Sequence, residues 1–283
     1  MPGIAMSQKE YRAHEGISST DLKRMTQSMA HYKYFHDNPE DKDTPELQFG
    51  RVYHKYCLEP YDFDNEFVVT PNIDRRTKSG KEAWNNFVLE SKGKEVISEA
   101  LFNTIDEMRK TLYATPFAKK LIYGEHEKSF FWTDEETGVE CKCRPDSFGS
   151  VGNQPICVDL KTCQCAETDR FMRSAIRLGY DIQAAHYCDG LESNLNKKFI
   201  FVFVAQEKKP PYAVNILQAD EFFIRSGREV RTSLLETYNK CMEMGEWPAY
   251  MGFSDDMKIG SLSITTWMKK AYGYEESEES YET

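Results

Sequence analysis

One short apolar stretch with charged side chains at alternate positions constrains the fold of this chain most. It is the segment 156–161, in which Val158 and Leu160 alternate with Asp159 and Lys161. Successive side chains of a β-strand point to opposite faces. The pattern therefore predicts a strand that buries Val158 and Leu160 and turns Asp159 and Lys161 together to its other face.

The residues just before this strand predict its partner. Residues 148–155 are rich in Gly, Ser and Asn, which is typical of a turn, and a preceding strand ends at Arg144-Pro145-Asp146. In such a β-hairpin Asp146 lies near Asp159 and Lys161. Two carboxylates and an ammonium at one place stabilise a fold poorly, but they suit a divalent cation that activates water for attack on a substrate.

Several motifs along the chain resemble those of the PD-(D/E)xK nuclease superfamily. Pro145-Asp146 followed by Asp159-Leu160-Lys161 is similar to its signature. Gly50-Arg51-Val52-Tyr53-His54 resembles the GxxxH motif of the RecB-like branch, and Gln183-Ala184-Ala185-His186-Tyr187 resembles its QxxxY motif. Gly16-Ile17-Ser18 and the basic segment 75–81 resemble the RecE-like (exonuclease VIII type) subgroup. The order and rough spacing agree over about residues 11–245.

The resemblance implies an α/β fold with a mixed central β-sheet flanked by helices and an N-terminal helical part. It also implies roles. Asp146, Asp159, the Leu160 carbonyl and His54 would bind one or two Mg²⁺ or Mn²⁺ ions, and Lys161 would orient the attacking water. Glu127, Gln183 and Tyr187 would complete the catalytic set. Taken singly, each residue also has an ordinary interpretation. His54 fits a hydrogen-bonded histidine, and Glu127 fits an exposed acid at the start of a strand. Gln183 and Tyr187 fit packing residues.

The remaining periodicity predicts a helical first half and a mixed second half. We expect a flexible segment 1–16, then a single nuclease domain over 17–270. Its helical part covers about 17–123 and its catalytic sheet and helices about 124–250, and an acidic disordered tail follows at 271–283. Helices are expected at 18–37, 45–59, 79–91, 95–113, 168–179, 181–192 and 220–245, and strands at 67–69, 127–132, 139–144, 199–205 and 212–217.

Charge and composition limit the possible partners. The net charge of −10 opposes nucleic-acid binding in general, but phosphate contact needs only a local basic surface. Two such groups occur, and each also fits a solvated charged face: Arg75, Arg76, Lys78 and Lys81, then Arg170, Arg173 and Arg177 at helical spacing. No apolar run is long enough to span a membrane and no apolar signal segment opens the chain, so we expect a cytoplasmic protein. The family resemblance implies a bacterial or phage origin.

Eight cysteines raise the question of a metal centre or a disulfide framework. A chain of 283 residues without a signal segment is an improbable disulfide scaffold. It also has no CxxC pair and no group of cysteines near its end, as a zinc or iron–sulfur site of the RecB-like type would need. We therefore expect reduced, structural cysteines. A metal-binding redox protein is the alternative that they leave open.

The RecE resemblance implies a metal-dependent 5′→3′ exonuclease that degrades linear double-stranded DNA. It would leave 3′ single strands for recombination with a RecT-like annealing partner, and it would act as a ring-like homo-oligomer, a trimer or tetramer. Two other functions share the fold: a sequence-specific endonuclease of the same superfamily, and a DNA-binding module without catalysis. The GxxxH and QxxxY motifs argue against the first, and the presence of each key residue argues against the second.

Overall fold

The computed structural model describes residues 3–39, 44–250 and 252–253, together with Ile264, Met268, Ala271 and Tyr272. Residue contacts divide the chain into one compact unit, Met1–Trp247, and a second, Pro248–Thr283. The first unit contains the elements described below. The expected domain end at residue 270 falls in the second unit, and the expected acidic tail lies outside the described residues except for Ala271 and Tyr272. No helix among the described residues is long and apolar enough to cross a membrane.

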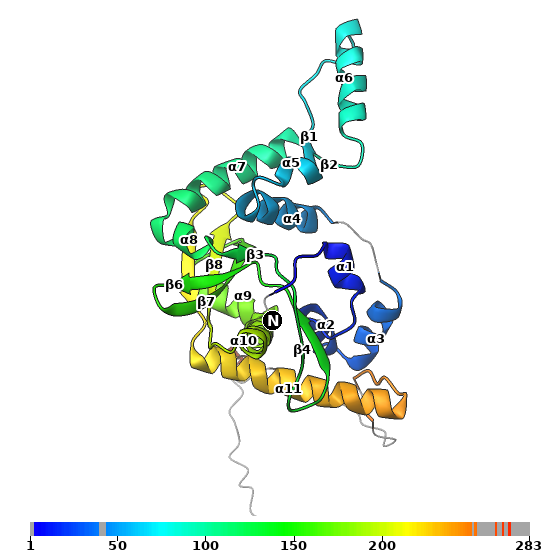
Figure 1. Ribbon diagram of the computed structural model, residues 1–283, viewed down its shortest axis with the longest axis vertical. Coiled ribbons are helices and arrows are strands. Elements are labelled where there is room, and N and C mark those ends of the chain that lie inside the picture. The colour runs from blue at the N-terminus through cyan, green and yellow to red at the C-terminus, as the bar shows by residue number, and fades with distance from the viewer. Residues whose placement is uncertain are drawn as a thin grey trace, which may run out of the picture. The chain divides into compact units, whose positions relative to one another are not determined.

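A five-stranded sheet lies at the centre of the first unit (Figure 1). Its strands, in spatial order, are β3 (Glu125–His126), β6 (Ser147–Val151), β7 (Gln154–Cys163), β8 (Ile200–Glu207) and β9 (Val214–Gln218). The pair β7–β8 is parallel and the other pairs are antiparallel, so the sheet is mixed, as predicted. β9, at one edge, confirms the predicted edge strand.

The hairpin that carries Asp159 differs from the predicted one. The partner of β7 is β6, and residues 148–151, expected in the turn, belong to that strand. Gly152, whose φ of 60° favours glycine, takes the tight turn with Asn153, so the longer turn expected at 148–155 is wrong. The predicted strands at 127–132 and 139–144 become β4 (Phe130–Thr133) and β5 (Glu140–Cys143), a separate antiparallel pair. Pro145, which lacks an N–H donor, lies where β5 ends and β6 begins.

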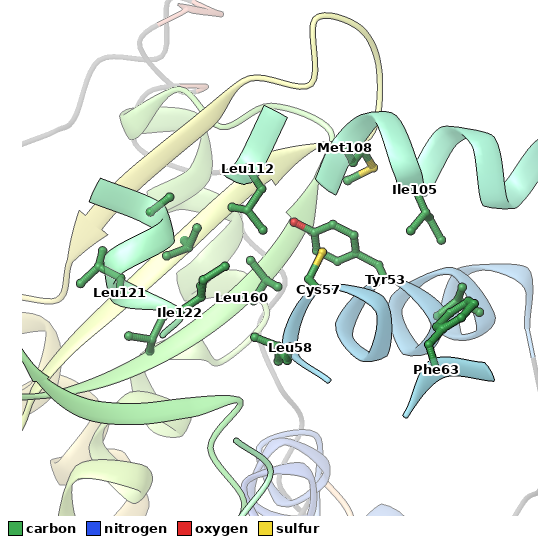
Figure 2. Packing of buried hydrophobic residues seen from close by; sticks show 14 of the residues in the cluster. Tyr53, Cys57, Leu58, Phe63, Ile105, Met108, Leu112, Leu121, Ile122 and Leu160 are labelled. Carbon is green, nitrogen blue, oxygen red and sulfur yellow. The ribbon is translucent and has the colours of Figure 1, made fainter. Parts of the chain in front are cut away.

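Three helices from the first half of the chain cover one face of the sheet. They are α4 (Pro45–Leu58), α7 (Glu99–Ala114) and α8 (Pro116–Leu121). In Figure 2 their apolar side chains converge on Leu160 of β7. This core supplies the burial that holds α4, and with it His54, against the sheet. Its members include Val52, Tyr53, Cys57, Leu58, Ile105, Met108, Leu112, Leu121, Val158, Leu160, Val202 and Val204.

Helices from the second half pack on the opposite face. α9 (Thr168–Arg177) places Phe171 against Phe203 of β8, with ring centroids 5.6 Å apart. α10 (Tyr180–Leu195) follows directly, and α11 (Glu221–Met244) packs against it (Figure 1). A Cβ on Gly227 would lie 2.1 Å from the Asp181 backbone oxygen, so only glycine permits this close approach.

The N-terminal part forms three helices: α1 (Gln8–Ala13), α2 (Ser19–Met25) and α3 (Met29–Asp37). The single helix expected at 18–37 is therefore divided, because Ser28 caps a new helix by accepting from the His31 amide. The segment expected to be flexible holds α1, and Ile4 pairs with Ser129. Lys142 of β5 also donates to the backbone of residues 11–14, and Arg144 donates to the Met6 carbonyl.

An insertion between α4 and α7 contains the strand expected at 67–69 and a second strand that was not expected. It consists of α5 (Phe63–Glu66), β1 (Phe67–Val69), α6 (Lys78–Glu90) and β2 (Glu95–Ile97). β2, predicted as the first turn of a helix, pairs in parallel with β1 instead. Ser98 then caps α7, so the helix begins after this strand. In Figure 1 α6 stands beyond the β1–β2 pair, away from the central sheet.

Candidate active site

The alternation predicted for β7 is confirmed. Val158 and Leu160 are buried against α4, α7 and α8, while the side chains of Asp159 and Lys161 lie on the other face. Lys161 Nζ is 2.5 Å from Asp159 Oδ2 and 4.9 Å from the centroid of the Tyr180 ring. Burial alone would lower the pKa of Lys161, but the charges of Asp159 and Asp146 outweigh it and raise that pKa. Lys161 is therefore a charged ammonium held at a fixed place.

Asp146 and His54 meet at Leu160 from two different elements. Asp146, just before β6, accepts a hydrogen bond from the Leu160 amide at Oδ2 (2.8 Å). His54 Nε2, on α4, is 2.6 Å from the Leu160 carbonyl oxygen. Because a carbonyl only accepts, Nε2 carries the proton, and in its neutral form the ring has a lone pair on Nδ1. That Nδ1 lies 3.7 Å from Asp146 Oδ1.

Glu127 joins this pair from the link between β3 and β4. Its φ of 51° is unusual for a residue other than glycine, and its amide donates to the Asp146 carbonyl (3.3 Å). The side chain forms an ion pair with Arg144 (2.9 Å). Burial, followed by the negative charge of Asp146, raises the pKa of Glu127 to about 7. Burial also raises the pKa of Asp146, and the charge of Asp159 adds to the rise, whereas His54 and Lys161 act in the opposite direction.

These three side chains fit a divalent cation. His54, Glu127 and Asp146 each offer one ligand atom, and the atoms lie within 4.8 Å of one another. Two carboxylate oxygens and a neutral imidazole nitrogen suit Mg²⁺ or Mn²⁺, and a cation would offset the excess negative charge. Of the expected ligands, Asp159 is outside this group, and the Leu160 carbonyl already accepts from His54. Glu127, expected as a catalytic acid, is a third candidate ligand.

Asp159 is held instead by a chain of polar contacts. Gln183 of α10 donates from Nε2 to Asp159 Oδ1 (2.6 Å) and accepts from Lys23 Nζ at Oε1 (2.7 Å). Lys23, on α2, is 4.9 Å from the Tyr180 ring centroid. Burial, followed by the charge of Lys161, lowers the pKa of Lys23 to about 7. Asp159 is only 1% exposed, so these contacts replace water as its hydrogen-bond partners.

Tyr187 lies one helical turn after Gln183, as its spacing predicted. Its ring centroid is 6.3 Å from that of Phe201 in β8. Burial raises the pKa of its hydroxyl well above the usual range, and the nearby Tyr11, Asp159 and Asp146 add to the rise. A hydrogen bond with Ser19 acts in the opposite direction. The phenol is therefore neutral and close to both acids.

The two basic groups occupy different positions. Arg170, Arg173 and Arg177 are exposed on α9, which packs on the sheet face that carries Asp159. Arg75 and Arg76, by contrast, belong to the insertion. The Arg75 guanidinium lies over the Trp84 ring (3.2 Å), and Arg76 is paired with Asp74 (2.9 Å). Lys78 and Lys81 are exposed on α6. The fold therefore places the α9 group beside the catalytic sheet and the α6 group apart from it.

The eight cysteines are free, and six of them are buried. Burial raises the pKa of the Cys57 thiol to about 12 and of the Cys143 thiol well above its usual range. Such thiols are protonated in the metal-free protein. No cysteine joins a group of candidate metal ligands within the described part of the chain. This agrees with the packing role expected for them.

Three residues of the site were not found from the sequence. Arg144 pairs with Glu127, and Lys23 and Tyr180 hold the side of the site that contains Asp159. Arg144 directly precedes the Pro145-Asp146 motif, which was the one available signal. Lys23 lies 160 residues from Gln183, its hydrogen-bond partner, so no local pattern could identify it.

Comparison with known proteins identifies the fold as PDDEXK-like. Residues 18–258 match a family model described as a PDDEXK-like domain of unknown function (DUF3799). The structure is similar to that of a protein from Eubacterium rectale provisionally described as an exonuclease, with a TM-score of 0.59 and 16% identity over 95% of this chain and 98% of that one. A phage-related exonuclease from Haemophilus somnus 129PT matches with a TM-score of 0.34 and 13% identity over 83% of this chain and 98% of that one, which is too distant to carry weight. No curated protein sequence matches the chain.

Proposed function

The chain belongs to the family of PDDEXK-like domains designated DUF3799, and we propose that it is a metal-dependent nuclease that hydrolyses DNA phosphodiester bonds. One observation carries the proposal. The ligand atoms of His54, Glu127 and Asp146 converge within 4.8 Å, and Leu160 links this group to the charged Lys161 next in β7. A cation site beside a fixed ammonium suits an anionic phosphate and a water nucleophile.

Each side chain has a role in this proposal. His54, Glu127 and Asp146 hold Mg²⁺ or Mn²⁺, with Asp159 and the Leu160 carbonyl as further candidate ligands. The cation supplies Lewis acidity toward the phosphate. Lys161 orients the attacking water and balances the charge that develops on the phosphate oxygens, while Asp159 and Tyr180 keep its ammonium in place. Gln183 fixes Asp159, and Tyr187 encloses the site.

The finer proposal rests on the motif resemblance to RecE-like enzymes. It is a 5′→3′ exonuclease on linear double-stranded DNA that leaves 3′ strands for a RecT-like annealing protein. The description of the Eubacterium rectale protein as an exonuclease is in line with it. Arg170, Arg173 and Arg177 on α9 are the first candidates for phosphate contact, because α9 adjoins the sheet face of Asp159. Arg75, Arg76, Lys78 and Lys81 are the second.

A DNA degradation assay with Mg²⁺ tests the activity and its type. The substrates are linear duplex labelled at either the 5′ or the 3′ end, and covalently closed circular duplex. We expect loss of linear DNA alone, with early release of the 5′ label. Early release of the 3′ label would reverse the polarity, and nicking of the circle would favour the endonuclease.

Two variants provide the controls for that assay. Asp146→Asn should remove cleavage, because the amide can still accept from Leu160 but lacks the charge that a cation needs. Asp37→Asn, which changes an exposed acid of α3, should cleave like the wild type. Equal activity of wild type and Asp146→Asn, or no cleavage with any divalent cation, would overturn the nuclease proposal.

A ring-like homo-oligomer of three or four copies completes the proposal. Enclosure of DNA by a ring would let one molecule cleave many nucleotides before release. Sedimentation velocity of the purified protein measures its mass directly. A species of 32.9 kDa at all concentrations would contradict the ring.

A further inference from the structure

Lys23, like Tyr180, is a residue of the site that no motif indicated. It lies on α2, and its stem crosses α10 at Gly179, where a Cβ would come within 3.2 Å of Lys23 Cγ. Its ammonium then donates to Gln183 Oε1 (2.7 Å) beside the Tyr180 ring. Gly179 also has a φ of 65°, so glycine there serves both the backbone turn and the passage of the lysine.

The chemistry of the amide explains what Lys23 can do. A carboxylate accepts only, so Gln183 must present its NH₂ group to Asp159. In its ammonium form, which prevails below its pKa of about 7, Lys23 donates only, so it must face the Gln183 oxygen. The opposite orientation of the amide would set an oxygen against the Asp159 carboxylate and an NH₂ group against the ammonium. Gln183 is 5% exposed, so water is poorly placed to relieve such a mismatch.

We propose that Lys23 is a positioning residue for the nuclease reaction, because it fixes the orientation of the Gln183 amide and thereby the place of Asp159 and Lys161. The contacts run from Lys23 to Gln183, from Gln183 to Asp159, and from Asp159 to Lys161. Lys23 acts through Gln183 and touches neither the phosphate nor the cation. This inference rests on the proposed function, since a positioning residue requires a reaction to position.

The variants isolate the ammonium from its stem. Lys23→Met keeps an apolar stem over Gly179 but removes the donor, whereas Lys23→Arg keeps a donor and the charge. Arg24→Met is the matched control, because Arg24 is the next residue of α2 and pairs with Asp21 instead of the site. Gln183→Leu removes the amide at similar volume. Thermal unfolding of each variant shows whether it folds, and Lys23→Leu, which also lacks a donor, replaces Lys23→Met if the latter does not.

The first readout needs no activity. NMR spectra of the ¹⁵N-labelled, metal-free protein contain the side-chain amide signals of Gln183, which are identified by their loss in Gln183→Leu. Lys23→Met should move these signals, and Arg24→Met should leave them in place. Unmoved signals in Lys23→Met would overturn the proposal. This readout holds even if the wild type cleaves no DNA, which would overturn the nuclease function instead.

The second readout is a double-mutant cycle on cleavage. Lys23→Met should lower kcat about 10- to 100-fold, the effect of one charged hydrogen bond, and change KM less than about threefold. Lys23→Arg should recover part of that loss. In a protein that already carries Gln183→Leu, adding Lys23→Met should lower kcat by less than about threefold further. An undiminished loss in that background, or a Lys23→Met variant as active as Arg24→Met, would overturn the proposal.

Discussion

The two sides of the candidate active site are built in opposite ways, although both adjoin Leu160. On one side, His54, Glu127 and Asp146 converge with more negative than positive charge, and the pKa values of Glu127 and Asp146 are raised. On the other side, Asp159 is bound by both Lys161 and Gln183, and Lys23 completes the contacts. We refer to them as the acidic side and the lysine side.

The contrast separates two tasks. The acidic side has one positive partner, Arg144, for its two half-buried acids, and such an excess of negative charge is the arrangement that binds a cation. The lysine side pairs Asp159 with both Lys161 and Gln183, which is the arrangement that holds an ammonium still. A nuclease needs both, because a cation activates the phosphate and a fixed donor places the water. Changes on the two sides should therefore differ in kind as well as in size.

The largest effect is expected on the lysine side. Lys161→Met should lower kcat about 10³-fold, the upper range for loss of one preorganised donor at a developing charge. Its affinity for Mn²⁺ should stay within about threefold of the wild type, since Lys161 binds no cation. Lys120→Met, at an exposed position of α8, is the control for loss of an ammonium. A parallel loss of Mn²⁺ affinity would remove the distinction between the two sides.

The acidic side should make stability depend on pH. Burial, then Asp146, raises the pKa of Glu127 from 4.5 to about 7 on folding. The folded protein thus binds this proton more tightly, so the contribution to stability is complete below pH 4.5 and is lost as the pH rises to about 7. The loss is at most about 3 kcal/mol.

Urea unfolding of the metal-free protein measures this loss. The free energy of unfolding of the wild type, relative to Glu127→Gln, should decrease between about pH 5 and pH 8, because the variant has no proton to lose at this position. A difference that stays constant across that range would show that folding does not raise the pKa of Glu127. The acidic side would then have no excess of negative charge.

His54→Gln should weaken cation binding without changing the lysine side. Removal of an imidazole ligand is expected to lower Mn²⁺ affinity about 10- to 100-fold, measured by calorimetry. Activity should recover in part at high Mn²⁺ concentration, unlike that of Lys161→Met. His36→Gln, at an exposed position of α3, is the control. Unchanged Mn²⁺ affinity would assign His54 a purely structural hydrogen bond with Leu160.

The smallest effect concerns the approach of DNA. Replacing Arg170, Arg173 and Arg177 together by alanine should reduce the slope of log affinity against log salt by about 0.9 for each phosphate that is no longer bound. The α6 pair, Arg75 and Arg76, should contribute less, because both guanidiniums already have partners within the insertion. Fluorescence anisotropy with duplex DNA measures the salt dependence of both variants, with Ca²⁺ used in place of Mg²⁺. An equal slope for wild type and the α9 variant would show that the three arginines of α9 form a solvated charged face that binds no phosphate.

Short-range patterns predicted much of the fold and part of the site. The alternation in β7 set the faces of Asp159 and Leu160, and the helical spacing of α10 put Gln183 and Tyr187 on one face. Both depend on the geometry of a single element, which a few residues determine. The mixed sheet and the helices over both its faces were likewise predicted, and the family match supports them.

Other features were decided only by tertiary structure. Glu127 and Asp146 meet because β3 and β4 belong to different sheets and the chain turns between them, and Lys23 reaches Gln183 across 160 residues. Strand β2 forms because β1 lies beside it, although its residues continue a helical pattern. The sequence by itself determined which side chains share an element and a face. Which elements meet depends on the packing free energy summed over the whole unit. Residues far apart in the sequence contribute to that sum as much as neighbours do, and the packing they stabilise decides which acids have an excess of negative charge around them.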